Sequence, residues 1–148
     1  FEALGSTNVV AGTAQIKGAF RTMDEQWRAQ AHELLQALAE KISTETGSKI
    51  KLHIAKGYPF LKNDPALSAR VEEILKNTLG HSKVRGLDLR MTAEDFAFYS
   101  QEKPVCFFRL GVGNQEKGIV HAVHHPRFDI DEQALEIGVK CMVQIALA

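Results

Sequence analysis

Hydrophobic residues recur every three or four positions between residues 24 and 46, with polar residues between them. This spacing predicts an amphipathic helix, because it places the apolar side chains on one face. Thr22, followed three residues later by Glu25, resembles a capping box, which stabilises a helix start by about 1 kcal/mol. Gly47 is a typical residue just past a helix end. The apolar face of this helix would consist of Trp27, Ala31, Leu34, Leu35, Leu38 and Ile42.

Two segments on either side of this helix alternate apolar and polar residues, which is typical of a half-buried β-strand. In residues 8–21 one side carries Ala14, Ile16, Gly18 and Phe20. In residues 49–54 the alternating residues are Lys49, Ile50, Lys51, Leu52, His53 and Ile54. The order strand, helix, strand predicts two layers, in which the helix covers one face of a sheet and the other face stays open.

The next segment, residues 57–65, interrupts these patterns with Gly57, Pro59 and Pro65. Glycine and proline break both helices and strands, so we interpret this segment as a hinge or a domain boundary. The chain is therefore expected to contain two domains, residues 1–56 and residues 57–148.

After this boundary the spacing of apolar residues predicts three helices and two strands. The helix starts are expected at Asp64 with Pro65 in the first position, at Thr92 or Asp95, and at Asp129 or Asp131. The first helix should bury Leu67, Val71, Ile74 and Leu75, and the last should bury Leu135, Gly138, Met142 and Ile145. The strands are expected at residues 83–89 and 104–112, and the continuous apolar run of the second indicates that both of its faces are covered.

The composition excludes some classes of function. The 148 residues include 18 basic and 18 acidic side chains, so no net positive charge is available to attract nucleic acid or an anionic membrane. No apolar run approaches the ~18 residues of a membrane-spanning helix. Cys106 and Cys141 lie in apolar stretches without signs of secretion, so we expect free buried thiols and a cytoplasmic protein. The chain begins at Phe1 without methionine, and we expect it to start inside a longer protein.

Three of the six histidines stand within "VHAVHHPRF", residues 120–128. Imidazole can bind zinc-like ions or transfer protons near neutral pH. A catalytic metal centre needs at least three protein ligands, and the chain lacks HExxH, a CxxC pair and paired histidines on one helix face. The spacing alone therefore leaves two interpretations open, a partial metal site and a polar surface loop.

Other charged residues also allow two interpretations each. Arg21 lies on the open face of its predicted strand, where it is either simply solvated or binds a carboxylate through its planar guanidinium. The adjacent acids Glu94 and Asp95 either stabilise a helix start through the helix dipole or line a site. The stretch "LGVGN" lacks the full glycine fingerprint of a nucleotide-binding loop, so nucleotide binding is disfavoured.

Four stretches taken together resemble a known family. They are "TNVVAGTAQIKGAFRT", "GYPFLKND", "MTAEDFAFY" and "VHHPRFDIDEQALEIG", which follow the family's order and span nearly the whole chain. On these motifs the chain resembles the binuclear metallo-amidohydrolases that include aminoacylase, hippurate hydrolase and the indole-acetyl-amino-acid hydrolases.

The resemblance implies an α+β/α/β fold in two parts. Residues 1–56 would be the second part of a ferredoxin-like lid domain, which commonly forms a homodimer. Residues 57–148 would be the C-terminal part of an α/β zinc-peptidase-like catalytic domain. The intact enzyme would use two divalent ions, of zinc, manganese, cobalt or nickel, and a metal-bound water to hydrolyse the amide bond of an N-acyl amino acid.

The resemblance also assigns individual residues. His124 stands in the family's His-x-Pro-x-Phe pattern and matches a metal ligand, whereas His125 occupies a variable position. Asn8 matches a residue that holds the substrate or the oxyanion, and Arg21 matches the residue that binds the substrate carboxylate. The pocket-lining stretch of the family corresponds to Glu94 and Asp95.

The other metal ligands and the general-base glutamate of the family have no counterpart in this chain. We therefore expect the 148 residues alone to be inactive and to bind no metal. Two alternatives stay open, a non-catalytic dimerisation or binding module and a family member that has lost its chemistry.

Overall fold

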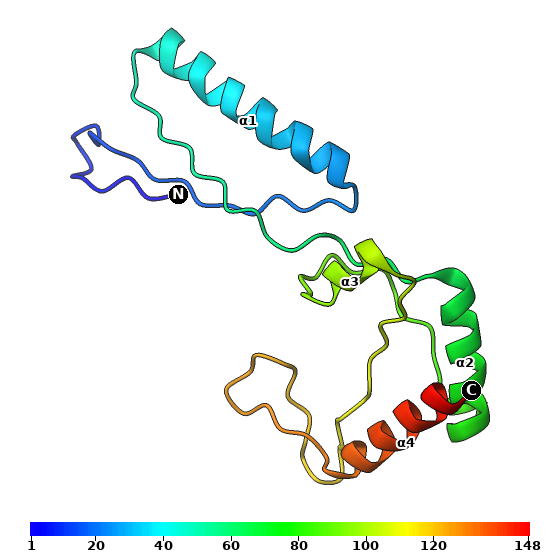
Figure 1. The fold of residues 1–148 in the computed structure, drawn as a ribbon. Coiled ribbons are helices and arrows are strands. Elements are labelled where there is room, and N and C mark those ends of the chain that lie inside the picture. Colours follow the sequence, from blue (N-terminus) through cyan, green and yellow to red (C-terminus); the bar gives the residue numbers. More distant parts are fainter. The chain divides into compact units, whose positions relative to one another are not determined.

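The computed structural model describes all residues from Phe1 to Ala148 and divides into two compact units, Phe1–Phe60 and Leu61–Ala148. The elements in chain order are α1 (Glu25–Thr46), α2 (Pro65–Leu79), the 3-10 turn η1 (His81–Lys83), α3 (Ala97–Glu102) and α4 (Gln133–Leu147) (Figure 1). None of these helices is long and apolar enough to cross a membrane. The sequence placed the boundary after residue 56, and the assignment of the two parts to a lid and a catalytic domain stays a prediction.

The cap of helix α1 in the first unit is Asp24, two residues after the predicted cap Thr22. The carboxylate of Asp24, not the hydroxyl of Thr22, accepts the hydrogen bond from the backbone N–H of Trp27, at 2.9 Å. Thr22 instead accepts the N–H of Asp24 itself at 3.2 Å. The predicted capping box is therefore wrong, because the cap must directly precede the first helical residue. Gly47 ends the helix with φ of 70°, as predicted.

Polar contacts hold residues 57–60 against the first turns of α1. The guanidinium of Arg28 donates to the backbone carbonyl of Tyr58 at 2.7 Å and pairs with the carboxylate of Glu25. That carboxylate also accepts the N–H of Phe60 at 3.1 Å. The C-terminal end of the first unit is thereby held against the start of α1 around one ion pair.

The predicted strands do not form a sheet, and the structure is mostly helical. The described residues contain two isolated β-bridges, Glu2–Gln15 and Asn114–Ile119, and no longer ladder. A strand satisfies its backbone groups only beside a partner strand, and an isolated strand is not stable in water. Without a sheet the apolar residues stay exposed, as Ile16 does at 78%. The apolar face of α1 is also largely uncovered, including Trp27, Leu34, Leu38 and Ile42.

In the second unit α2 packs against α4. Asp64 caps α2 by accepting the N–H of Leu67 at 2.8 Å, and Pro65 is the first helical residue, as predicted. The core consists of Val71, Leu75 and Cys141. Around it pack Leu67, Leu79, Val84, Cys106, Phe108 and Ile145. The predicted apolar stripe of α2 is thus confirmed at Val71 and Leu75.

The predicted buried face of α4 is confirmed at Gly138 and Ile145 and wrong at Leu135 and Met142. Its buried residues are Ala134 and Cys141, whereas Leu135 and Met142 are 60% and 58% exposed. Gly138 belongs to the buried face, since a Cβ there would lie 3.1 Å from Leu110. One residue step rotates a side chain by about 100° around a helix, so Ala134 and Cys141 are buried where the sequence predicted their neighbours Leu135 and Met142.

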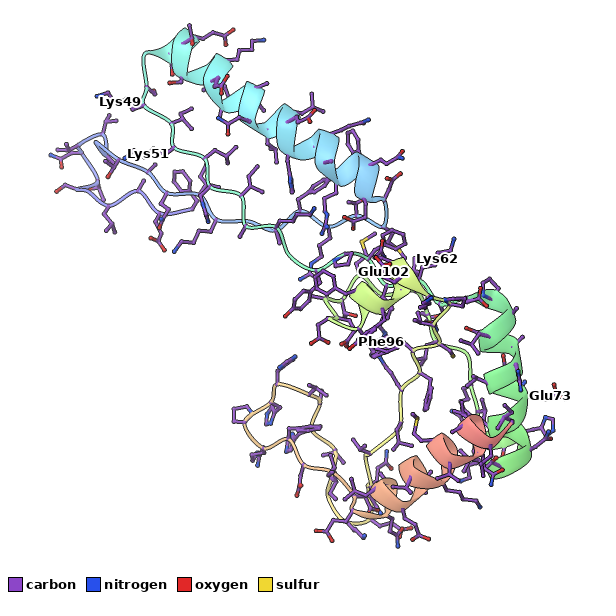
Figure 2. All side chains as sticks on the ribbon, in the orientation of Figure 1. Lys49, Lys51, Lys62, Glu73, Phe96 and Glu102 are labelled. Carbon is purple, nitrogen blue, oxygen red and sulfur yellow. The ribbon has the colours of Figure 1, made fainter.

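The caps predicted for the last two helices are also wrong. The cap position of α4 is Glu132 and that of α3 is Phe96, and neither side chain makes a capping hydrogen bond. The carboxylate of Asp131, which directly precedes the cap position of α4, accepts the N–H of Gln133 at 3.3 Å. Helix α3 is short and lies between Phe96 and its last residue, Glu102 (Figure 2).

Both cysteines are free thiols, as the sequence predicts. Cys141 is 1% exposed in the α2–α4 core, and Cys106 packs against the same core. Burial raises the pKa of the Cys141 thiol, because the thiolate would lose its hydration. Cys141 is therefore a protonated core residue at neutral pH.

Candidate functional site

His124 lies in a loop of residues 113–131, which connects the apolar segment 104–112 to α4. The first part of this loop is a hairpin in which Asn114 and Ile119 exchange two backbone hydrogen bonds, at 2.9 and 2.8 Å. Gly118 has φ of 71°, a conformation that glycine adopts without steric cost. The hairpin is therefore held by its own backbone.

The backbone of His124 has φ of 74°, and His124 is the one non-glycine residue of the chain with positive φ. Such a conformation costs roughly 1–3 kcal/mol and persists where its surroundings hold it. Two turn hydrogen bonds flank it, from His125 N–H to the carbonyl of Ala122 at 3.1 Å and from Phe128 N–H to the carbonyl of His125 at 2.9 Å. The side chain is exposed, and neither ring nitrogen has a hydrogen-bond partner in the protein. Both nitrogens of His124 are thus accessible to a ligand.

The other two histidines of the loop bind each other. The rings of His121 and His125 stack with centroids 4.0 Å apart and an interplanar angle of 4°. Nδ1 of His125 accepts the backbone N–H of Arg127 at 3.1 Å, so it carries no proton and the neutral ring holds its proton on Nε2. Of the three histidines, His124 is the one whose ring neither stacks on another histidine nor accepts a hydrogen bond.

Asp131 joins the two ends of the loop. Its backbone N–H donates to the carbonyl of Val112 at 2.8 Å. Its carboxylate accepts hydrogen bonds from the Asn114 amide at 2.6 Å and from the Lys117 ammonium at 2.7 Å. These bonds, with that from Asn114 the larger cause, lower the pKa of Asp131 from 3.8 to about 2. From the sequence, Asp131 was predicted only as a possible helix cap, because no local pattern links positions that are 14 and 17 residues apart.

An open depression lies beside the hairpin. Its lining consists of Val112, Gly113, Asn114, Gln115, Ile119, Val120, His121 and Asp129. His124 does not belong to this lining. No group of three or more His, Cys, Asp or Glu side chains in the described chain could hold a metal ion. The residues present therefore form no complete metal site among themselves.

The predicted pocket residues of the second unit lie just before α3. Glu94 is half-buried, and its carboxylate accepts the N–H of Phe96 at 3.5 Å. Asp95 is exposed. No hydrogen bond or ion pair joins either carboxylate to His124, so their role in a pocket stays a prediction.

The predicted substrate-binding residues belong to the first unit, where both are exposed. Asn8 lies in a turn that is closed by the hydrogen bond from Val9 N–H to the carbonyl of Ser6, at 3.1 Å. Arg21 lies directly before the segment that caps α1. Both residues lie in the segment 8–21 that the sequence predicted to be a strand; this segment forms no ladder, and the substrate-binding roles stay a prediction.

Comparison with known proteins determines the family. The sequence pattern of peptidase family M20/M25/M40 matches residues 3–148, nearly the whole chain. The chain belongs to this peptidase family. The family consists of metal-dependent hydrolases, and the resemblance inferred from the four motifs is thereby confirmed.

Three relatives illustrate the range of this peptidase family. "Probable hydrolase sll0100" of Synechocystis is 30% identical over 133 residues, 89% of this chain and 34% of the relative. "N-acetyldiaminopimelate deacetylase" of Shouchella clausii is 29% identical over 136 residues, 92% of this chain and 35% of the relative. "IAA-amino acid hydrolase ILR1-like 6" of Arabidopsis thaliana is 37% identical over 89 residues, 60% of this chain and 19% of the relative. The chain spans about a third of the length of the first of these, and no solved structure gives a significant match.

Proposed function

We propose that the chain is part of a metal-dependent amidohydrolase that cleaves the amide bond of N-acyl amino acids. Two relatives carry names that pair an acyl group with an amino acid, "N-acetyldiaminopimelate deacetylase" and "IAA-amino acid hydrolase ILR1-like 6". The observation that carries the proposal is the exposed imidazole of His124, held on a positive-φ backbone within a hairpin-supported loop. A ligand needs a free ring nitrogen in a fixed position, and His124 offers both.

In this proposal the chain supplies one metal ligand and the substrate contacts. His124 would bind one of two divalent ions of zinc, manganese, cobalt or nickel, with the other ligands and the general base outside these residues. Bound ions of this kind polarise a scissile carbonyl and lower the pKa of water. Arg21 would bind the α-carboxylate of the substrate through its guanidinium, Asn8 would donate to the carbonyl oxygen, and Glu94 and Asp95 would line the pocket.

The domain roles belong to the same proposal. Residues 1–56 would be part of a lid that forms a homodimer, and residues 57–148 part of the catalytic domain. The exposed apolar face of α1 is consistent with a unit that is covered by further protein in the assembled enzyme. The free thiols favour a reducing compartment, which supports a cytoplasmic location.

The test uses the intact protein and a pair of neighbouring histidines. Hydrolysis of N-acetyl amino acids is measured with added Mn²⁺ for the unsubstituted protein, for His124→Ala and for His121→Ala. Loss of a metal ligand should lower kcat/KM by at least about 100-fold, whereas His121→Ala should change it by less than about fivefold. Equal losses in the two variants would refute the ligand assignment. No hydrolysis of any N-acyl amino acid by the intact, metal-loaded protein would refute the activity.

The competing proposal is a non-catalytic dimerisation or binding module. It predicts dimers whose formation is independent of metal and of His124. The two proposals are distinguished by the same assay, because a binding module gives no turnover with either Mn²⁺ or Zn²⁺.

A further inference from the structure

The loop that carries His124 has two kinds of support. Residues 114–119 form the hairpin, in which the Asn114 side chain also accepts the N–H of Lys117 at 3.2 Å. Beyond the hairpin, the hydrogen bonds of residues 120–130 all join residues of this stretch to one another. The position of His124 relative to the rest of its unit therefore depends on where the two ends of the loop are held.

Both ends are held at one residue, Asp131, through its carboxylate and its backbone N–H. Asp131 is 8% exposed, and its carboxylate binds the hairpin in the first part of the loop through the Asn114 amide and the Lys117 ammonium, at 2.6 and 2.7 Å. Its backbone N–H binds the carbonyl of Val112, the last residue before the loop. Directly after Asp131 the chain enters α4, whose buried face packs in the core with α2. The side chain of Asp131 thus connects the hairpin to the first turn of a core helix, and its backbone N–H binds the residue before the loop.

The charge state of this carboxylate is constant under working conditions. Its lowered pKa, about 2, keeps it ionised across the neutral and mildly acidic range. A charged acceptor with two donors is stronger and geometrically more restrictive than a neutral one. The connection is therefore a permanent structural one and not a pH-dependent switch.

From this arrangement we propose that Asp131 is a positioning residue for His124, which closes the base of loop 113–131 through Asn114 and Lys117. Asp131 contacts neither substrate nor metal. It acts by restricting where the imidazole can be, as the outer partners of metal ligands do in general. The inference rests on the proposed function in so far as His124 is a metal ligand.

The test compares Asp131→Ala and Asp131→Asn with Glu132→Gln in the intact protein. Glu132 is the neighbouring carboxylate, is exposed and makes no side-chain capping bond, so its variant controls for the loss of one negative charge. The first measurement is amide hydrogen exchange in the metal-free protein. We expect Asp131→Ala to exchange at least about tenfold faster at residues 114–130, with α2 unchanged, and Glu132→Gln to behave like the unsubstituted protein.

The second measurement is Mn²⁺ affinity, obtained by titrating the metal-free protein. Loss of an outer partner typically weakens metal binding by about 10–100-fold, and we expect this range for Asp131→Ala. Steady-state kinetics should show a lower kcat with KM changed by less than about threefold, because Asp131 does not touch the substrate. The Mn²⁺ affinity of Asp131→Asn should lie between those of the unsubstituted protein and Asp131→Ala. Asparagine keeps an acceptor for Asn114 but loses the charge that pairs with Lys117.

Several results would overturn the inference. Unchanged exchange in the loop would show that Asp131 does not hold it. Faster exchange with unchanged Mn²⁺ affinity would show that the order of the loop does not position His124. Should Asp131→Ala not fold, Lys117→Met removes only the ion pair and must give the same two changes in weaker form. Failure of the proposed function is a separate result, because the unsubstituted protein would then bind no Mn²⁺, while the exchange data would still decide whether Asp131 holds the loop.

Discussion

The side chain of Asn63 binds both backbone polar groups of Phe107, a residue 44 positions further along the chain. Its Nδ2 donates to the carbonyl oxygen of Phe107 at 2.9 Å, and its Oδ1 accepts the N–H at 2.8 Å. A carboxamide carries the same donor and acceptor as a peptide group, so Asn63 takes the place of one residue of a neighbouring strand. The backbone of Asp64 adds one more bond, to the carbonyl of Val105 at 2.8 Å. The apolar segment 104–112 is therefore held without a β-ladder.

Replacing Asn63 by alanine should destabilise the protein by about 1–3 kcal/mol, because it leaves two backbone groups of half-buried Phe107 without partners. Asn63→Asp should cost at least as much, since it keeps the acceptor but places a carboxylate oxygen against the carbonyl oxygen of Phe107. Urea unfolding of the intact protein measures the effect, and Asn77→Ala, an exposed amide on α2, is the control. Equal urea midpoints for Asn63→Ala and Asn77→Ala would contradict the stabilising role assigned to the Asn63–Phe107 contact.

The buried face of α4 can be tested at Gly138. A Cβ at this position would lie 3.1 Å from Leu110, so Gly138→Val should overpack the contact and destabilise the protein by about 1–3 kcal/mol. Met142→Gln changes a residue that the sequence wrongly predicted to be buried, and it should stay within about 0.5 kcal/mol of the unsubstituted protein. A loss of stability in thermal unfolding as large for Met142→Gln as for Gly138→Val would contradict the exposure of Met142.

The ionisation of Asp131 should appear in the pH dependence of stability. Its pKa is about 2 in the folded protein and 3.8 in the unfolded reference, so the folded state favours the carboxylate. The contribution of this carboxylate to the free energy of unfolding is complete above pH 3.8 and is lost as the pH falls towards 2. The difference in unfolding free energy between the unsubstituted protein and Asp131→Asn should therefore be constant from pH 7 to pH 5 and shrink below pH 4. A difference that grew on acidification would contradict the ion pair with Lys117.

The proposed role of Arg21 makes a prediction about substrate selectivity. Arg21→Met should raise KM for an N-acetyl amino acid by about 10–100-fold, because a charge-assisted bidentate contact to a carboxylate is lost. The corresponding N-acetyl amino acid amide, which has no carboxylate, should be hydrolysed equally by both proteins. Arg21→Lys should recover part of the loss, since lysine keeps the charge but not the planar geometry. A similar effect on both substrates would show that Arg21 supports the fold and does not bind the carboxylate.

The sequence predicted what depends on local interactions. The presence of α1 and α2, the Asp64 cap and the terminal Gly47 follow from side chains that act within one or two helical turns, and all four are confirmed. The family also followed from sequence, because its motifs are short and keep their order along the chain. The cap at Thr22 failed because a shift of two residues changes which amide the side chain can reach.

Other features depended on partners distant in the sequence. Alternating residues in 8–21 specify a strand only if another strand accepts its hydrogen bonds, and the chain offers a single bridge there. The burial of Cys141 in place of the predicted Met142 was decided by packing in the core with Val71 and Leu75, which are distant in the sequence.

What the sequence by itself determined is the set of helices, the family and the identity of His124 as the candidate ligand. Only the tertiary structure decided that Asn63 replaces a strand neighbour of Phe107 and that Asp131 joins the two ends of the histidine loop. The physical reason is that a hydrogen bond between distant residues leaves no periodic trace in the sequence. It forms when the packing of the core brings a donor and an acceptor to within about 3 Å of each other.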